Sequence, residues 1–217
     1  MAHLKPGSSG EFNGKIGDVV IYRWGKKIVG RSTPRKTNRK ATKLQTGQRA
    51  ILGFISNILS PLTEAINIGF ASKKGTITAM NAAVRYNLKH AVSGIFPDLT
   101  VDYAKVQLSK GYLDHVYMPG ITKIEDNKVR IEWLNPVNLK LGVEENDTVH
   151  LCFYSETTRR TIEFENAALR SDGYTESTLG QRRINGTIHV WMFMVAAKGK
   201  AVSNSRYLGM FELDKLK

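Results

Sequence analysis

The chain has 217 residues, of which 41% are hydrophobic and 24% charged, and its formal net charge is +13 at pH 7. This length and apolar content allow a substantial core in one large or two small domains and exclude wholesale disorder. The charge implies attraction to polyanions. The single cysteine, Cys152, excludes an internal disulfide bond and favours a reducing compartment.

The positive charge is concentrated near the N-terminus. Residues 1–50 contain twelve Lys and Arg side chains against Glu11 and Asp18, whereas the remaining residues are close to balanced. A basic head on a near-neutral body predicts that one region meets an anionic partner.

Residues 1–13 are polar and include Pro6-Gly7-Ser8-Ser9-Gly10, which predicts a flexible arm. They contain no apolar core of the length that a secretory signal needs. The longest apolar region, residues 51–70, is interrupted by polar residues and by Pro61, so we expect no membrane span. These features predict a cytoplasmic protein.

A β-hairpin is predicted next, with a first strand at residues 19–22, a turn at Trp24-Gly25-Lys26 and a return strand at residues 27–31. Both faces of its first strand are apolar, and an isolated hairpin is marginally stable in water. We therefore expect the hairpin to join a sheet, either its own or that of a neighbour, and to mediate self-association. The residues predicted for this contact are Val19, Val20, Ile21, Tyr22, Trp24, Ile28 and Val29.

A strongly basic segment follows Pro34. One interpretation is phosphate contact, since Lys and Arg release counterions from nucleic acid; the other is a solvated, charged connector. No aromatic residue lies between Trp24 and Phe54, which weakens the case for base stacking in this run. The candidate contacts for nucleic acid or another polyanion are Arg23, Lys26, Lys27, Arg31, Arg35, Lys36, Arg39, Lys40, Lys43 and Arg49.

Two helices are predicted from apolar residues spaced three and four apart. The first begins near Thr42 and ends before Pro61, where a new segment starts. The second has Thr78 as its N-cap and a stop at Ser93-Gly94. Their small and apolar faces favour packing in a core over a cofactor site.

From Thr100 onward the apolar period changes to two, with turn signals between about seven short strands. This pattern is typical of an antiparallel β-sandwich of the immunoglobulin or fibronectin kind. The predicted fold class is therefore α+β and mainly β. The predicted domains are an arm at 1–13, a basic hairpin with helices at 14–99, and a β-sandwich at 100–217.

The motifs of common catalytic sites are missing from the sequence. It contains no dinucleotide-binding glycine fingerprint, no phosphate-binding loop and no Cys/His cluster of zinc-ligand spacing. Cys152 sits in a predicted strand and reads as a buried, inert thiol. Asp147 lies in an acidic turn, where we expect it to be solvated. We predict no catalytic residue, no cofactor and no metal.

Several stretches of the chain resemble an uncharacterised family of bacterial proteins known only as a domain of unknown function. The resemblance implies no activity, ligand or site residue, and residues 14–49 also resemble hypothetical proteins of phage-related regions. The stretches that carry the family resemblance are residues 14–24, Arg31-Ser32, 45–49, Asn81-Ala82-Ala83, Ser109-Lys110-Gly111 and 203–209.

The sequence predicts a non-enzymatic structural or assembly protein. It would form a homo-oligomer through its hairpin and present a basic surface to nucleic acid or to an acidic protein. The alternative is a sequence-independent nucleic-acid-binding protein that uses residues 23–49. An enzyme with a site in its loops is the least favoured reading, because no acid, base or nucleophile can be named.

Overall fold

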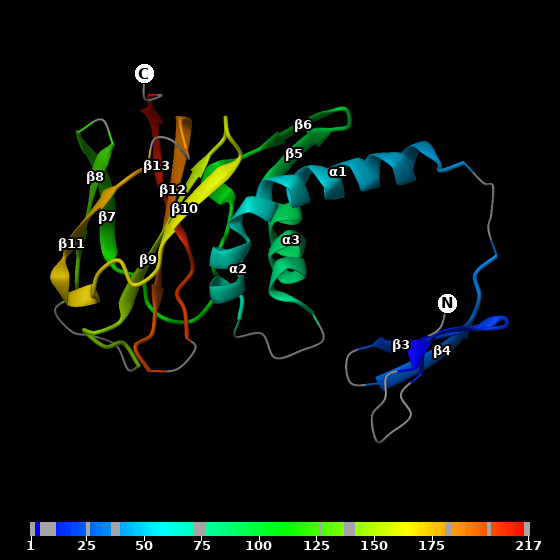
Figure 1. Ribbon diagram of the computed structural model, residues 1–217. Helices are drawn as coiled ribbons and strands as arrows, with labels where there is room; N and C mark the ends of the chain where they lie inside the picture. Colours follow the sequence, from blue (N-terminus) through cyan, green and yellow to red (C-terminus); the bar gives the residue numbers. More distant parts are fainter. Residues whose placement is uncertain are drawn as a thin grey trace. The chain divides into compact units, whose positions relative to one another are not determined.

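The computed structural model describes residues 3–4, 12–24, 27–35, 40–71, 77–125, 127–136, 142–180, 184–198 and 201–214. As predicted, the protein is mainly β, with several antiparallel sheets and helices between them (Figure 1). It divides into two compact units, Met1–Thr42 and Lys43–Lys217. The division predicted from the sequence falls instead between residues 99 and 100.

The N-terminal unit is one antiparallel sheet with strand order β1-β2-β3-β4. The predicted hairpin is present as its last two strands. Two parts of the predicted flexible arm, residues 3–4 and 12–13, differ from that prediction because their backbones pair with each other; its other residues lie outside the described part. The strands are β1 (His3–Leu4), β2 (Phe12–Ile16), β3 (Val19–Trp24) and β4 (Lys27–Ser32).

The second unit begins with the helical region. The predicted helices are present, and Thr78 caps the second as expected, because its hydroxyl accepts a hydrogen bond from the Asn81 N–H at 3.2 Å. Pro61 lies in a short turn of 3-10 helix that begins at Ser60, so the first helix ends before it. The elements are α1 (Lys43–Leu59), η1 (Ser60–Leu62), α2 (Thr63–Gly69) and α3 (Ala79–His90).

A hairpin of β5 (Val92–Ile95) and β6 (Asp98–Val101) follows α3. The predicted helix stop at Ser93-Gly94 is therefore late, since these residues already belong to β5. Beyond η2 (Tyr103–Lys105), Val106 and Leu108 are buried without belonging to a strand, because they cover the core from an extended loop.

Two further antiparallel sheets complete the unit, with strand orders β11-β8-β7 and β10-β9-β12-β13. Sequence reasoning missed β7, which is mostly exposed, and β11, whose two buried residues are the polar Thr175 and Ser177, because neither strand shows a clear alternation of apolar and polar residues. A short 3-10 turn, η3 (Arg170–Asp172), precedes β11. The strands are β7 (Tyr117–Glu125), β8 (Lys128–Leu134), β9 (Thr148–Ser155), β10 (Arg160–Phe164), β11 (Tyr174–Thr178), β12 (Gly186–Val195) and β13 (Arg206–Leu213).

The sheet β10-β9-β12-β13 is covered on both faces (Figure 1). On one face, Phe153 and Val190 share a core with Val129 and Ile131 of the three-stranded sheet. On the other, Trp191 joins a second core with the helices. Strands β9 and β12 are therefore buried on both sides, which explains their nearly continuous apolar runs.

The helical run Lys43–Gly69 is long and apolar enough to cross a membrane by length and composition. Its second half, however, packs against the sheet and α3. Leu59, Leu62 and Ile66 are fully buried there, which is the environment of a core helix.

Candidate functional site

The N-terminal sheet sorts its side chains onto two different faces. Val20 lies opposite Arg31, Tyr22 opposite Val29 and Trp24 opposite Lys27. Since directly opposed residues and alternate residues of a strand share a face, these six lie together. Lys15 joins them because it pairs with Val20. We call this set of seven residues the aromatic–basic face.

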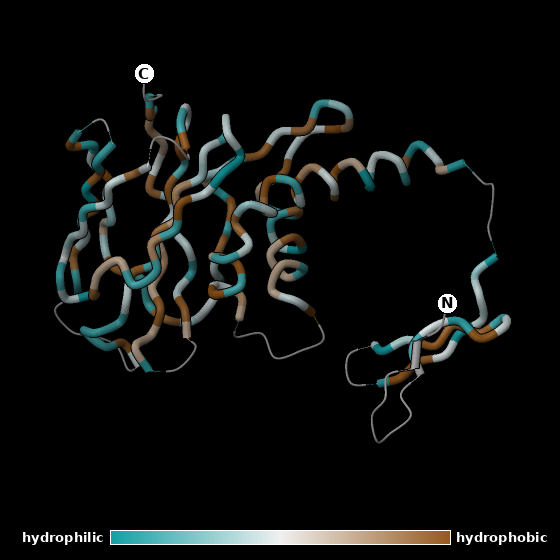
Figure 2. The backbone as a smooth tube through the Cα atoms, in the orientation of Figure 1, coloured by the Kyte–Doolittle hydropathy of each residue, from teal (hydrophilic) through white to brown (hydrophobic). Residues whose placement is uncertain are grey.

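The opposite face is aliphatic. Ile16 pairs with Val19, and Ile28 lies on the same face two strands away. Ile16, Val19 and Ile28 expose 53%, 44% and 54% of their surface, and Ile21 is half-buried between them. We call Ile16, Val19, Ile21 and Ile28 the aliphatic face; Figure 2 shows apolar segments along β3 and β4. Arg23 lies at its end, opposite Ile28.

The predicted self-association residues are therefore divided between the faces. Val19, Ile21 and Ile28 belong to the aliphatic face, whereas Val20, Tyr22, Trp24 and Val29 belong to the other. Among the described residues between 13 and 35, none is buried. The sheet thus has no enclosed core of its own in the part of the chain that the structure describes.

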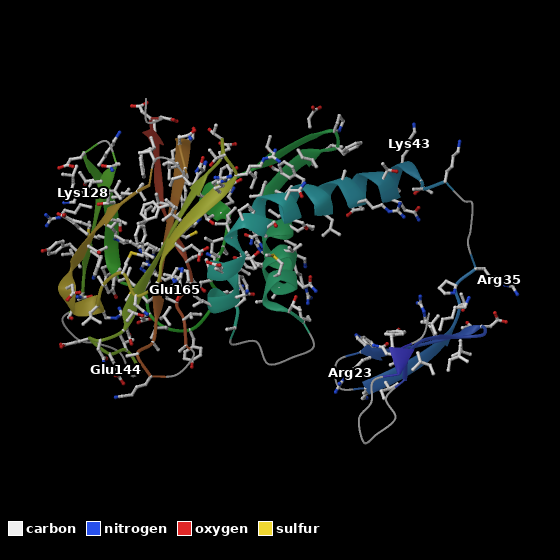
Figure 3. All side chains as sticks on the ribbon, in the orientation of Figure 1. Arg23, Arg35, Lys43, Lys128, Glu144 and Glu165 are labelled. Atoms are coloured by element: carbon white, nitrogen blue, oxygen red, sulfur yellow. The ribbon has the colours of Figure 1, made fainter. Side chains whose placement is uncertain are left out.

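The predicted cationic contacts are exposed wherever the structure describes them. Figure 3 labels Arg23 on β3, Arg35 after β4 and Lys43 at the start of α1. Lys27 and Arg31 stand on the aromatic–basic face. Lys40 and Arg49 are also exposed, and Lys26, Lys36 and Arg39 lie outside the described residues.

The aromatic–basic face changes the interpretation of the basic segment. The sequence places no aromatic residue within the cationic run, but the sheet brings Tyr22 and Trp24 beside Lys27 and Arg31. Trp24 is 71% exposed. Aromatic rings beside cations on an open sheet can stack bases and contact phosphates at once.

Ile16 and Lys15 were missed by sequence reasoning, which began the hairpin at Val19. The signal was present in Gly17-Asp18, a two-residue turn sequence flanked by apolar residues. Gly17 adopts a positive φ of 53° in this turn, a conformation that glycine reaches without steric cost.

Elsewhere, the described part of the chain offers little for catalysis or metal binding. It holds no group of three His, Cys, Asp or Glu side chains that could bind a metal ion. Burial raises the pKa of the Cys152 thiol well above its ordinary value, so the reactive thiolate is disfavoured. His150 lies 3.4 Å from Glu163, but both side chains are enclosed in the core.

Comparison with known proteins shows a family without showing a function. No curated protein matches the sequence. A family model described as a family of unknown function, DUF6266, matches residues 11–209. Since this match spans most of the chain, the protein belongs to the DUF6266 family.

Proposed function

We propose that this protein is a non-enzymatic structural or assembly protein that self-associates through the aliphatic face of its N-terminal sheet and presents a basic contact surface. The observation that carries the proposal is the exposure of Ile16, Val19 and Ile28 together on one face. Contiguous exposed apolar residues are typical of interaction sites.

The energetics of a small sheet support a partner for this face. A small antiparallel sheet gains stability when its hydrophobic face is covered, and none of the described side chains of this four-stranded sheet is buried. The second unit, by contrast, has two enclosed cores. A copy of the same sheet is a suitable cover, because a twofold contact places one apolar patch on another. The edge strand β4 offers a second route, by strand addition.

Sedimentation velocity of the full chain tests this proposal. The variant Ile16→Thr/Val19→Thr/Ile28→Thr keeps β-branched side chains, and so strand propensity, while it removes apolar contact. We expect the wild type to sediment as a homo-oligomer and the variant as a monomer of 24.3 kDa. The matched control, Trp24→Ser/Lys27→Gln, changes the opposite face and should remain oligomeric.

A monomeric wild type at every concentration and salt would overturn the proposal, since it would mean that the aliphatic face is covered within one chain or left open. Equal loss of assembly in both variants would overturn the assignment to the aliphatic face.

A second candidate function, sequence-independent nucleic-acid binding, is favoured by the aromatic–basic face. Tyr22 and Trp24 supply rings, and Lys15, Lys27 and Arg31 supply charge on the same surface. Strands of a sheet present such groups to single-stranded nucleic acid in several unrelated folds. This candidate is compatible with assembly, because the two faces point in opposite directions.

Binding of a fluorescent oligonucleotide, measured as a function of salt, tests the second candidate. Stacking on an exposed ring is worth about 1–3 kcal/mol per base, so Trp24→Ser should weaken binding at least about fivefold. Lys27→Gln/Arg31→Gln should reduce the salt slope by about 0.7 per lost contact on single strands. Ile28→Thr is the control on the opposite face. Unchanged affinity in the Trp24 and Lys27/Arg31 variants would exclude this face as the binding surface.

The proposal also includes a more specific description of the fold of the second unit. The strand orders β11-β8-β7 and β10-β9-β12-β13, around a shared core, support an immunoglobulin- or fibronectin-like sandwich in which the seven strands follow one another as A, B, C, C′, E, F and G. Such a domain would serve as a rigid body in a cytoplasmic or phage-like assembly.

A further inference from the structure

A cavity of about 450 Å³ opens in the second unit between α1, β6, η2 and the turn that joins β9 to β10. This volume is in the range of small-molecule sites. Its walls are mixed: Phe54 and Ile58 from α1 and Leu99 and Val101 from β6 are apolar, whereas Asn57 and Thr100 are polar. Tyr103 and Tyr154 contribute aromatic rings, 6.1 Å apart between centroids.

The two charged groups that line the cavity, Glu156 and Arg159, differ in their partners. Burial, together with the nearby Tyr154 and Glu156, raises the pKa of Tyr103, so its hydroxyl stays protonated. The Glu156 carboxylate lies 3.6 Å from His189 Nε2. Glu156 therefore lines the cavity and also lies beside His189.

Arg159 pairs with no carboxylate among the residues that the structure describes. Its exposed guanidinium therefore supplies the cavity with a positively charged donor group, beside the carboxylate of Glu156. A planar guanidinium favours the carboxylate group, which it can bind through two parallel hydrogen bonds.

The backbone of Arg159 adopts a conformation that is unfavourable for arginine. Its φ is +52°, a conformation that glycine and asparagine adopt more readily than arginine. The turn is fixed by hydrogen bonds from Thr158 N–H to Ser155 Oγ and from Glu156 N–H to the Thr187 carbonyl, both 3.1 Å. A side chain that opposes its local backbone preference marks a position where a function is to be sought.

We propose that this cavity binds a small apolar monocarboxylate, with its carboxylate on Arg159 and its hydrocarbon or aromatic body between α1 and β6 over Tyr103 and Tyr154. The site is distinct from the N-terminal sheet, so it goes beyond the assembly function and stands or falls independently of it.

Calorimetric titration of the full chain with two matched series tests the site. One series is octanoate, octanamide and octylamine; the other is phenylpropanoate with its amide and its amine. We expect the acids to bind best, the amides about fivefold more weakly and the amines more weakly still, as loss of a partly exposed charged pair predicts. Either no binding of any probe at millimolar concentration, or amines binding as tightly as acids, would overturn the proposal.

Three variants locate the binding. Arg159→Asn suits the positive φ, so the protein should stay folded, yet acid affinity should fall about fivefold and the preference over amides should disappear. Ile58→Trp fills the cavity and should abolish binding of all probes. Arg160→Gln, at the neighbouring exposed arginine, is the matched control and should bind like wild type.

Acid binding that survives both Arg159→Asn and Ile58→Trp would place the ligand elsewhere and refute the site. Equal affinity for acids and amides in the wild type would refute the carboxylate as the recognised group.

Discussion

A buried ion pair joins Asp147, just before β9, to Arg170 in η3. Both side chains are 1% exposed, and Arg170 Nε lies 3.2 Å from Asp147 Oδ2. The carboxylate also accepts from the Glu144 and Ala197 N–H groups, while the Arg170 carbonyl accepts from the Trp133 indole at 2.9 Å. The expectation that Asp147 is solvated in an acidic turn was wrong, because the arginine that compensates it lies 23 residues away in the sequence.

Asp147→Asn should therefore destabilise the protein strongly. It preserves the side-chain shape but removes the carboxylate that pairs with the buried guanidinium and leaves the weaker effect of Asp114 to offset that charge, which costs about 3–5 kcal/mol. Urea unfolding measures this loss. Glu144→Gln is the control, because the Glu144 side chain pairs with exposed Lys198 at 3.3 Å and the substitution should change stability by less than about 1 kcal/mol. Similar effects of the two substitutions would contradict the structural role of the buried pair.

Two buried histidines predict a pH dependence of stability. Burial lowers the pKa of His115 and of His189 below the ordinary 6.5. The unfolded chain therefore binds more protons than the folded one in the window below pH 6.5, so the free energy of unfolding rises with pH there and levels off above it.

We expect urea unfolding to show lower stability at about pH 5 than at about pH 7, with a slope of at most about 1.4 kcal/mol per pH unit for each histidine. His115→Gln should flatten the curve, since it removes one of the two groups whose pKa burial lowers. Stability that is constant or falls between these pH values would contradict the prediction.

At the scale of elements, the end of α2 packs closely against the loop that follows η2. Gly69, the last residue of α2, lies against the chain at Leu108 and Ser109, where a Cβ atom would meet the Leu108 carbonyl. The Lys110 N–H donates to the Gly69 carbonyl at 3.0 Å. Gly53, within α1, has open space at the Cβ position.

Alanine at these two glycines should have opposite effects on thermal stability. Gly69→Ala forces the loop away from α2 and should cost about 1–3 kcal/mol. Gly53→Ala removes backbone freedom from the unfolded chain without a clash and should stabilise by about 0.5–1 kcal/mol. Differential scanning calorimetry compares their midpoints; a stabilising Gly69→Ala would show that α2 and the loop do not approach each other this closely.

At the scale of the whole molecule, the stability of the sheet β10-β9-β12-β13 depends on the helices that cover one of its faces. Cys152, Tyr154, Trp191 and Phe193 face the helices and are buried in the core shared with them. Without the helices, these side chains would meet water, and each large aromatic residue would lose about 1.5–3 kcal/mol of burial. The strands are therefore not a self-sufficient body in the described structure.

Two fragments test this dependence. Residues 43–217 should fold, with a cooperative thermal transition near that of the full chain, because both cores lie within them. Residues 100–217, the sandwich domain predicted from the sequence, should be insoluble or lack near-ultraviolet circular dichroism. A cooperative transition of the shorter fragment would show that the strands stand alone and would favour the boundary between residues 99 and 100.

Local pattern was enough to predict the β3–β4 hairpin, the two main helices, the Thr78 cap and the strands β8, β9, β10, β12 and β13, because period, capping and turn chemistry act over a few residues. It also determined the family resemblance and the concentration of positive charge in residues 1–50. In the candidate site, the sequence identified the apolar and cationic residue types but mixed the members of two surfaces.

Only the tertiary structure decided which side chains share a surface and which are enclosed. Strand register separated Val19 and Ile28 from Tyr22 and Trp24, since a shift by one residue reverses every side chain. Helix packing covered the second face of β9 and β12, and a distant arginine allowed Asp147 to be buried. These outcomes depend on contacts between residues far apart in the chain, which local periodicity does not encode.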